Sequence, residues 1–182
     1  VTIQPDSLRI LHNPLTGWVL YASMGVDAAD FWAQYDHMYI PELGHNVSVT
    51  DYAHTLYIRA SWTDFNPQED VYGWKIDSNL RAYIEGAYQR NMRLAFRVVV
   101  DSRDKRTEFT PQFVKDAGAK GFMNKGKWSP YSDDPIFQKY YTKFVKTLAK
   151  DFNDPSKVEF IDGFGLGKWG EYHTMIYSTG DD

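Results

Sequence analysis

The sequence of 182 residues contains no cysteine. This absence excludes disulfide bonds, thiolate zinc sites and a cysteine nucleophile. The chain also lacks any apolar run near the roughly 20 residues that a membrane-spanning helix requires. We therefore expect neither a disulfide framework nor a membrane span, while the lack of cysteine leaves the cellular compartment open.

An excess of basic residues is missing as well. Twenty Lys and Arg residues stand against twenty-four Asp and Glu residues, which gives a net charge of -4. A protein of this charge has no electrostatic footprint for a nucleic-acid partner. The histidines are scattered, without a pair spaced as in His-x-x-x-His: His12, His37, His45, His54 and His173. We therefore expect no metal site and no cofactor.

No internal repeat, charge block or low-complexity linker divides the chain. Its length suffices for one domain with a core, since a domain of about 150 residues buries roughly 70% of its unfolded surface. Residues 1–182 are therefore expected to belong to a single domain. Because the sequence begins with Val1 rather than Met, we also expect that an upstream segment, such as a signal peptide, was removed. A secreted or periplasmic location is the corresponding hypothesis.

Four apolar segments alternate with helical or loop-like segments. The expected strands are 17–22, 55–60, 93–100 and 158–164, and the expected helices are 30–38, 77–91, 111–117 and 134–152. The last helix has the strongest pattern, because Asp134 can cap it and Pro135 suits its first turn. Residues 41–50 are expected to be irregular, and most of 101–133 to be a long polar loop. Strands that alternate with helices predict βαβ units and a parallel sheet.

Four β/α units in about 180 residues match the spacing of a (β/α)8 barrel, which typically has about 250 residues or more. The predicted fold class is therefore α/β: a (β/α)8 TIM barrel, of which this chain holds the first four β/α units. A complete four-stranded open domain is the alternative. Segment 176–182 offers no helix to cover the fourth strand, which favours the half barrel. The remainder is expected as a second chain, a separate fragment or a partner copy.

The fourth expected strand leads through glycines to a carboxylate. Glu171 follows Gly170 and is surrounded in sequence by Trp169, Tyr172 and His173. An α/β enzyme presents a catalytic acid in this way, at the carboxyl end of a strand. Glu171 is therefore the candidate catalytic residue, and Trp169 and His173 are candidate substrate contacts. The alternative is an ordinary acidic residue in a surface loop.

Two arginines lie inside expected strands, where an unpaired charge is costly to bury. Arg59 is near the end of the second strand and Arg97 is in the third, so both need carboxylate partners, and Asp162 in the fourth strand is one candidate. Our hypothesis is that Arg59 orients a catalytic carboxylate and that Asp101, one residue past the third strand, binds sugar hydroxyls. Structural ion pairing inside the barrel is the alternative.

Aromatic residues make up 16% of the chain, which suits either a packed core or a sugar site. Aromatic faces bind the apolar C–H surfaces of pyranose rings, and Tyr and Trp add a polar tip for hydroxyls. The candidate sugar platforms are Trp62, Trp74, Trp128 and Trp169. For each of them, packing in the core is the alternative.

Two stretches carry a resemblance to a known family. Residues 61–74 contain Trp62, a Pro-centred turn, an acidic residue and a Tyr-x-Trp sequence after the second strand. Residues 160–173 run from the fourth strand through glycines to Glu171. The chain thus resembles the N-terminal half of the clan-A retaining glycoside hydrolases. These are (β/α)8 barrels that include the β-galactosidases of families 42 and 35 and the family 5 glycanases, and the likeness is to β-galactosidase-like proteins of bacteria.

The resemblance implies a glycosidase that acts on the O-glycosidic bonds of an oligo- or polysaccharide, with retention of configuration. Glu171 would be the general acid/base, which first protonates the glycosidic oxygen and then deprotonates a water molecule. This role requires a protonated carboxyl at rest, for which we expect burial against Trp169 and Tyr172 and an ionised nucleophile nearby. The nucleophile of the family lies at the end of the seventh strand, beyond Asp182.

One departure from the family pattern keeps a second function open. Clan members commonly have Asn directly before the acid/base, whereas this chain has Gly170. The alternative is a non-catalytic carbohydrate-binding protein on a degenerate barrel, which retains aromatic platforms and has lost catalysis. A third hypothesis is an assembly domain that recruits a partner through the apolar edge of the fourth strand.

Overall fold

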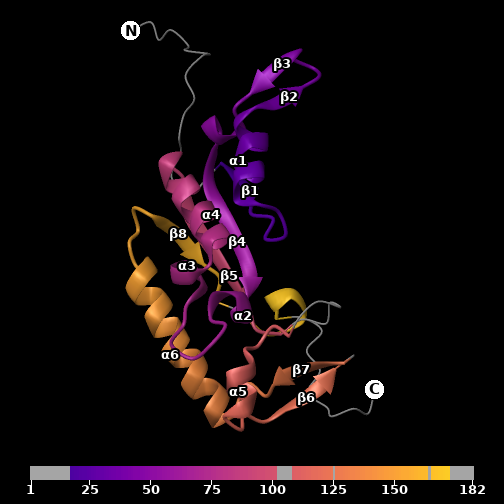
Figure 1. Cartoon of the computed structure of the whole chain (residues 1–182), viewed down its shortest axis with the longest axis vertical. Helices are drawn as coiled ribbons and strands as arrows, with labels where there is room; N and C mark the ends of the chain where they lie inside the picture. Colours follow the sequence, from indigo (N-terminus) through magenta and orange to yellow (C-terminus); the bar gives the residue numbers. More distant parts are fainter. Residues whose placement is uncertain (1–16, 102–107, 125, 164, 173–182) are drawn as a thin grey trace, which may run out of the picture.

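The four expected strands form one parallel sheet in the computed structural model (Figure 1), which describes residues 17–101, 108–124, 126–163 and 165–172. The sheet order is β1-β4-β5-β8, with β1 at Trp18–Tyr21, β4 at Ala53–Ser61, β5 at Arg93–Val99 and β8 at Val158–Ile161. Within the described residues the sheet is open and its strands do not close into a barrel. The α/β class with a parallel sheet is therefore confirmed.

The central strands β4 and β5 organise the sheet. They stay in register from Thr55 opposite Arg93 to Ser61 opposite Val99. The outer strands are shorter and pair only with the amino-terminal parts of this central pair. The carboxyl ends of β4 and β5 therefore extend beyond their outer neighbours.

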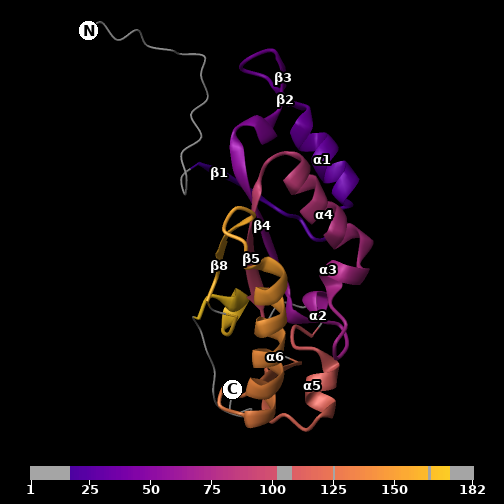
Figure 2. The same ribbon diagram turned by 90° about the vertical axis from the view of Figure 1, so that its left-hand side faces the viewer.

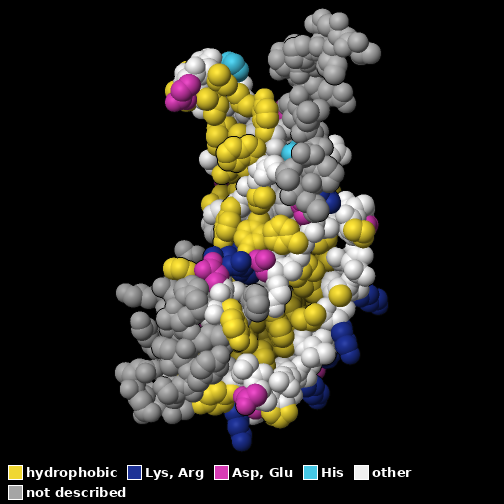
Figure 3. Space-filling model, turned by 180° about the vertical axis from the view of Figure 1, so that it is seen from behind, with side chains coloured by type: hydrophobic (Ala, Val, Ile, Leu, Met, Phe, Trp, Pro, Cys, Tyr) yellow, Lys and Arg dark blue, Asp and Glu magenta, His cyan; other side chains and the backbone are white. Residues whose placement is uncertain are grey.

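One face of the sheet is apolar and covered by helices. α1 (Ala28–Asp36), α4 (Ser78–Gln89) and α6 (Pro135–Phe152) lie on the same side of the sheet in Figure 2. The strand residues on this side are almost fully buried: Leu56, Ile58, Leu94, Phe96 and Val98. Successive strand residues point to opposite faces, so their neighbours in sequence lie on the other side. We call that side, which carries Tyr57, Arg59 and Arg97, the open face (Figure 3).

Capping residues set the helix starts as expected. Asp134 accepts hydrogen bonds from the backbone amides of Ile136 (2.9 Å) and Phe137 (2.8 Å), and Pro135 lies in the first turn of α6. These contacts satisfy amide groups that have no partner inside the helix. Asp77 caps α4 in the same manner. Both helix predictions are confirmed, as is the helix expected around residues 30–38.

The expectation of irregular structure is wrong in two places. β2 (Met38–Ile40) and β3 (His45–Val47) form an antiparallel hairpin, whose turn contains Gly44 at a φ of 69°. β6 (Gly121–Asn124) and β7 (Lys127–Pro130) form a second hairpin within the long polar stretch. Strands of three or four residues are too short to produce a recognisable alternation of apolar and polar residues.

The remaining described elements are short. They are α2 (Trp62–Phe65), α3 (Gly73–Ile76), α5 (Gln112–Asp116), and the 3-10 turns η1 (Val49–Asp51) and η2 (Lys168–Gly170). Of these, α5 confirms the short helix expected at 111–117. Among the described helices, none has the length and apolar character needed to cross a membrane.

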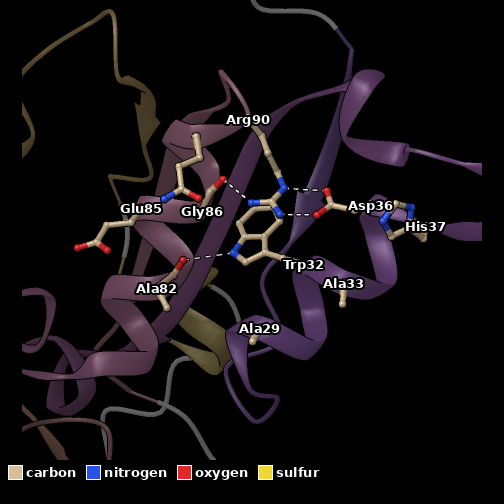
Figure 4. A pocket seen from close by; sticks show the side chains of 10 residues that line it. Ala29, Trp32, Ala33, Asp36, His37, Ala82, Glu85, Gly86 and Arg90 are labelled. Atoms are coloured by element: carbon tan, nitrogen blue, oxygen red, sulfur yellow. Dashed lines mark hydrogen bonds and ion pairs between the residues drawn. The ribbon is translucent and has the colours of Figure 1, made fainter.

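α1 and α4 meet in a close contact at Gly86 (Figure 4). The indole Nε1 of Trp32 in α1 donates a hydrogen bond to the carbonyl oxygen of Ala82 in α4 (3.2 Å). Arg90 covers the other part of this ring, with its guanidinium carbon 4.3 Å from the ring centroid, and forms an ion pair with Asp36. A Cβ atom at Gly86 would lie 2.1 Å from Trp32 Nε1. The helices can approach this closely only because Gly86 has no side chain.

We expect Gly86→Ala to lower the free energy of unfolding by about 1–3 kcal/mol through overpacking. This loss would occur although alanine is the better helix former by about 1 kcal/mol. Urea unfolding measures the change. Gly25→Ala is the control, since nothing lies within 4 Å of a Cβ atom at that position. A Gly86→Ala variant as stable as the wild type would contradict the close packing of α1 on α4.

Candidate functional site

The open face carries a row of aromatic side chains below a cluster of charges. The ring of Tyr57 in β4 lies between Tyr21 of β1 and Phe160 of β8, with centroid distances of 5.4 and 6.1 Å. Tyr21 and Phe160 are both exposed. In Figure 3, charged side chains occupy the middle of this face between apolar areas. The aromatic row thus forms the floor of a charged site.

Arg59 and Arg97 stand side by side at the next level of the sheet. They are register partners on β4 and β5, and each side chain is 22% exposed. Two parallel strands place such partners close together on the same face, where like charges repel each other. Partly buried guanidinium groups therefore need carboxylates nearby.

Asp162, just after β8, is the partner of Arg97. Its Oδ2 atom accepts hydrogen bonds from Arg97 Nε (2.6 Å) and from the Tyr57 hydroxyl (2.7 Å). The backbone amide of Asp162 donates to the carbonyl oxygen of Phe96 (2.9 Å), which continues the pairing of β8 with β5. The expectation that a buried arginine pairs with Asp162 is confirmed.

These contacts shift the pKa values of both partners of Asp162. Burial raises the pKa of the Tyr57 hydroxyl above its ordinary value, and the hydrogen bond to the Asp162 carboxylate raises it further. Partial burial lowers the pKa of Arg97, but its hydrogen bond to Asp162 and the nearby Glu171 outweigh this effect, so the net shift is upward. Tyr57 therefore stays neutral and Arg97 charged over the whole physiological range.

Glu171 lies above the two arginines. Its Oε1 atom is 2.9 Å from Arg97 Nη1 and 3.7 Å from Arg59 Nη1. Arg59 also donates from Nη2 to the backbone carbonyl oxygen of Trp169 (2.7 Å). The two arginines thus hold both the carboxylate and the backbone of the segment that carries it. Arg59 thus lies beside the candidate catalytic carboxylate, which the hypothesis that Arg59 orients this carboxylate requires.

The segment around Glu171 has an unusual backbone. Four of its residues have positive φ angles: Gly167 (80°), Trp169 (59°), Gly170 (71°) and Tyr172 (56°). For residues with a Cβ atom this region is sparsely populated, and such residues concentrate at functional sites. The Arg59 contact to the Trp169 carbonyl helps to maintain this conformation.

Gly170, directly before Glu171, has a positive φ angle of 71°. A left-handed residue costs little for glycine and is tolerated by Asn better than by most other residues. A Cβ atom at Gly170 would lie 3.4 Å from Val99 Cγ2, an ordinary contact. Gly170 therefore fits the backbone conformation at this position.

The surroundings of Glu171 differ from those expected for a resting general acid. Its side chain is 36% exposed, and Tyr172, which was expected to help bury it, is 57% exposed. Its closest described charged neighbours are two guanidinium groups. Burial of Glu171 against Trp169 and Tyr172 therefore stays a prediction, since the described residues leave its side chain partly exposed.

Trp62 lies in the core instead of on the open face. It begins α2, is 0% exposed and makes edge-to-face contacts with the rings of Phe113, Phe137 and Tyr141. In this position Trp62 has no surface for a ligand to contact, so the core alternative applies to it. The cause is local, because Ser61 caps α2 and the chain turns towards the helix-covered side at this point.

Two other candidate platforms are also core side chains. Trp74 is buried, and its Nε1 atom donates to Asp151 Oδ2 at the end of α6 (2.8 Å). Trp128 is buried in β7, with the ammonium group of Lys115 5.7 Å from its ring centroid. Only Trp169, which is partly exposed, lies at the charged cluster.

Asp101 lies at the carboxyl end of β5 but is 6% exposed. Its Oδ1 atom accepts a hydrogen bond from the hydroxyl of Ser129 in β7, and its backbone amide donates to Gly165 (3.3 Å). Its carboxylate thus anchors the β6–β7 hairpin. His173 lies outside the described residues. Within those residues, no group of three His, Asp or Glu side chains is arranged to hold a metal ion.

The sequence reasoning missed the aromatic row and a second ion pair. Tyr57 and Arg59 are two residues apart in β4, and strand residues at this spacing lie on the same face. This spacing is the signal in the sequence that could have placed both on the open face. On the same face, Glu159 of β8 is paired with Arg93 (3.2 Å) and accepts a hydrogen bond from Thr55. The open face thus carries arginine–carboxylate contacts at two levels, on either side of the aromatic row.

Comparisons of the sequence with protein-family models and with curated proteins found no match. Its function is therefore inferred from the site itself.

We expect Asp162→Asn to lower the pKa of Tyr57, because a neutral amide no longer disfavours the phenolate. The pKa should stay above the ordinary value of about 10, since burial persists. The titration of 13C-labelled tyrosine, with the Tyr57 signal assigned from Tyr57→Phe, measures the change. Glu159→Gln is the matched control and should leave Tyr57 unaffected. An unchanged Tyr57 titration in Asp162→Asn would contradict the hydrogen bond.

Proposed function

We propose that the chain is part of a glycoside hydrolase and that Glu171 is its general acid/base. The observation that carries the proposal is the position of Glu171 near the carboxyl ends of β4 and β5, on the open face, in contact with Arg59 and Arg97. Catalytic residues of (β/α)8 enzymes lie at this end of the strands. The proposed substrate is an oligo- or polysaccharide, cleaved with retention, and the proposed location is secreted or periplasmic.

The arrangement of the sheet supports a barrel with four further β/α units. In a (β/α)8 barrel the helices cover the outer face, and side chains from neighbouring strands fill the interior in levels. Here the helices share one face, while the open face carries the aromatic row at one level and the Arg59–Arg97 pair at the next. In our proposal, residues 1–182 are the N-terminal part of one catalytic domain, and a second fragment or chain supplies the rest.

In the proposed mechanism, Glu171 acts in both steps of retaining hydrolysis. It protonates the leaving glycosidic oxygen, and it later deprotonates the water that releases the glycosyl-enzyme. The nucleophile lies outside residues 1–182. Arg97 Nη1 and Arg59 Nη1 lie 2.9 and 3.7 Å from Glu171 Oε1, so both guanidinium groups help to position the carboxylate for these steps. The first step requires Glu171 to hold a proton. In the proposal, the ionised nucleophile lies near Arg59, where its negative charge offsets the positive charge of the guanidinium group and favours protonation of Glu171.

The same contacts support a second candidate. A carboxylate paired with two arginines and preceded by Gly170 also suits a structural ion pair in a carbohydrate-binding protein that has lost catalysis. Tyr21, Phe160, Trp169 and Tyr172 would then provide aromatic contacts to the sugar, since they are exposed or partly exposed aromatic residues around the cluster. Hydrolysis assays distinguish the two candidates.

Native mass spectrometry of the protein as isolated from its source tests the barrel. We expect the 182-residue chain to travel with further barrel units, as a second polypeptide, as a covalent continuation or as a second copy. Closing the sheet would also bury the exposed side chains of β1 and β8. A stable, monomeric 182-residue protein would contradict the half barrel and favour a complete open α/β domain.

The catalytic role is tested by assaying the same material on a panel of aryl glycosides. Glu171→Gln should lower kcat by about 10²- to 10⁴-fold, because general acid/base catalysis typically contributes that much. Glu85→Gln is the control, since Glu85 is exposed on α4 and pairs only with Arg81 among its described ionic partners. Full activity of Glu171→Gln would contradict the role of Glu171. Saccharide binding by calorimetry without hydrolysis of any glycoside would favour the binding protein.

A further inference from the structure

A chain of polar contacts links the aromatic floor of the open face to Glu171. The Tyr57 hydroxyl donates to Asp162, Arg97 Nε donates to the same Asp162 oxygen, and Arg97 Nη1 donates to Glu171. Each contact is 2.9 Å or shorter. Tyr57 comes from β4 and Arg97 from β5, while Asp162 directly follows β8 and Glu171 directly follows η2. The chain therefore connects Glu171 with residues that do not touch it.

The geometry of Arg97 makes Asp162 responsible for its orientation. A guanidinium group is a rigid planar fork, so fixing one nitrogen constrains the directions of the others. The contact of Nε with Asp162 leaves Nη1 aimed at Glu171. Arg97 also lies over the Tyr57 ring, with its guanidinium carbon 5.9 Å from the ring centroid. Asp162 and Tyr57 thus hold Arg97 through contacts that do not involve Glu171.

Asp162 is held firmly enough for this role. Its backbone amide is bonded to Phe96 of β5, and its carboxylate to Tyr57. Tyr57 in turn is fixed between the rings of Tyr21 and Phe160. The support for Arg97 is therefore tied to the sheet by the bonds of Asp162 to β5 and β4, and attachment to rigid elements gives a functional group a precise position.

We propose that Asp162 is a positioning residue that, through Arg97, fixes the Glu171 carboxylate and controls its affinity for a proton. Arg97 shares its charge between the two carboxylates. Asp162→Asn removes a negative charge near Glu171, which leaves the positive charge of Arg97 less compensated and disfavours proton binding. Removal of Arg97 takes away the positive charge nearest to Glu171 among its described contacts and favours proton binding. The two changes must therefore act on Glu171 in opposite directions. The consequence for catalysis rests on the proposed function, but the contact itself does not.

The charged and titratable groups that face Glu171 from the described elements are few. Arg59 approaches from β4 and Arg97 from β5, while Asp162 and Tyr57 act through Arg97. Arg59 also bonds the Trp169 carbonyl, so its replacement would disturb the backbone as well as the charge. Changes at Arg97 and Asp162 are therefore the cleaner test.

The open face provides a matched control. Glu159 and Arg93 form a second carboxylate–arginine pair on the same two strands, one level below the aromatic row, and Thr55 supports it. Glu159→Gln removes a charge from β8 just as Asp162→Asn removes one directly after it. Because Glu159 has no contact with Arg97 or Glu171 among the described interactions, this substitution should leave Glu171 unchanged.

The test is a pH titration of 13C-glutamate-labelled protein by NMR, with the Glu171 carboxyl signal assigned from Glu171→Gln. We expect the midpoint of the Glu171 signal to move to lower pH in Asp162→Asn and to higher pH in Arg97→Gln. Glu159→Gln should give the wild-type midpoint. If Asp162→Asn does not fold, the charge-neutral double variant Arg97→Gln/Asp162→Asn replaces it, and its midpoint should lie below that of Arg97→Gln alone; equal midpoints in these two variants would overturn the proposal.

Equal midpoints in the wild type, Asp162→Asn and Arg97→Gln would overturn the proposal, as would shifts of both variants in the same direction. A shift in Glu159→Gln as large as that in Asp162→Asn would also overturn it, because the effect would then be a general field of the face. These readouts do not need a substrate. Where the glycosidase is active, the limb of the pH–rate profile that reports Glu171 should move in the same directions. Absence of hydrolysis with the predicted NMR shifts would refute only the proposed function.

Discussion

The register between β4 and β5 is the constraint on which the rest of the structure depends. If β5 slipped by one residue against β4, every side chain of β5 would move to the opposite face of the sheet. Phe96 would then lie on the open face, while Arg97 would lie on the helix-covered face without its carboxylate partners. Apolar burial and the cost of burying unpaired guanidinium groups therefore select the same register.

That register also creates the charged site. Once Arg59 and Arg97 are neighbours, their mutual repulsion must be relieved, and Asp162 and Glu171 supply two negative charges for the two positive ones. The carboxylates come from the chain that follows β8, so the arginines also determine where this chain runs. The left-handed backbone at Trp169 is maintained within that neutral cluster, with its carbonyl oxygen bonded to Arg59. Packing of the sheet and formation of the site are thus consequences of one pairing.

Much of the fold can be predicted from the sequence, because long apolar runs such as 93–100 and the capped helix from Asp134 produce strong local patterns. The pairing of Arg97 with Asp162 also follows from the rule that buried charges need partners. The two hairpins could not be predicted, since three or four residues carry too little periodicity. The burial of Trp62 depends on rings from α5 and α6, far along the chain, and the exposure of Glu171 depends on a backbone conformation that composition does not reveal.

The β2–β3 hairpin extends from the end of the molecule where β4 begins (Figure 1), whereas Glu171 contacts Arg59 near the end where β4 finishes. Its turn, residues 41–44, is exposed and contributes no partner to the four-stranded sheet. Exposed turns of this kind accept insertions without disturbing the core. The turn of this hairpin is therefore a suitable attachment point for a fluorophore or an immobilising peptide, because a label there leaves the charged site accessible to solvent.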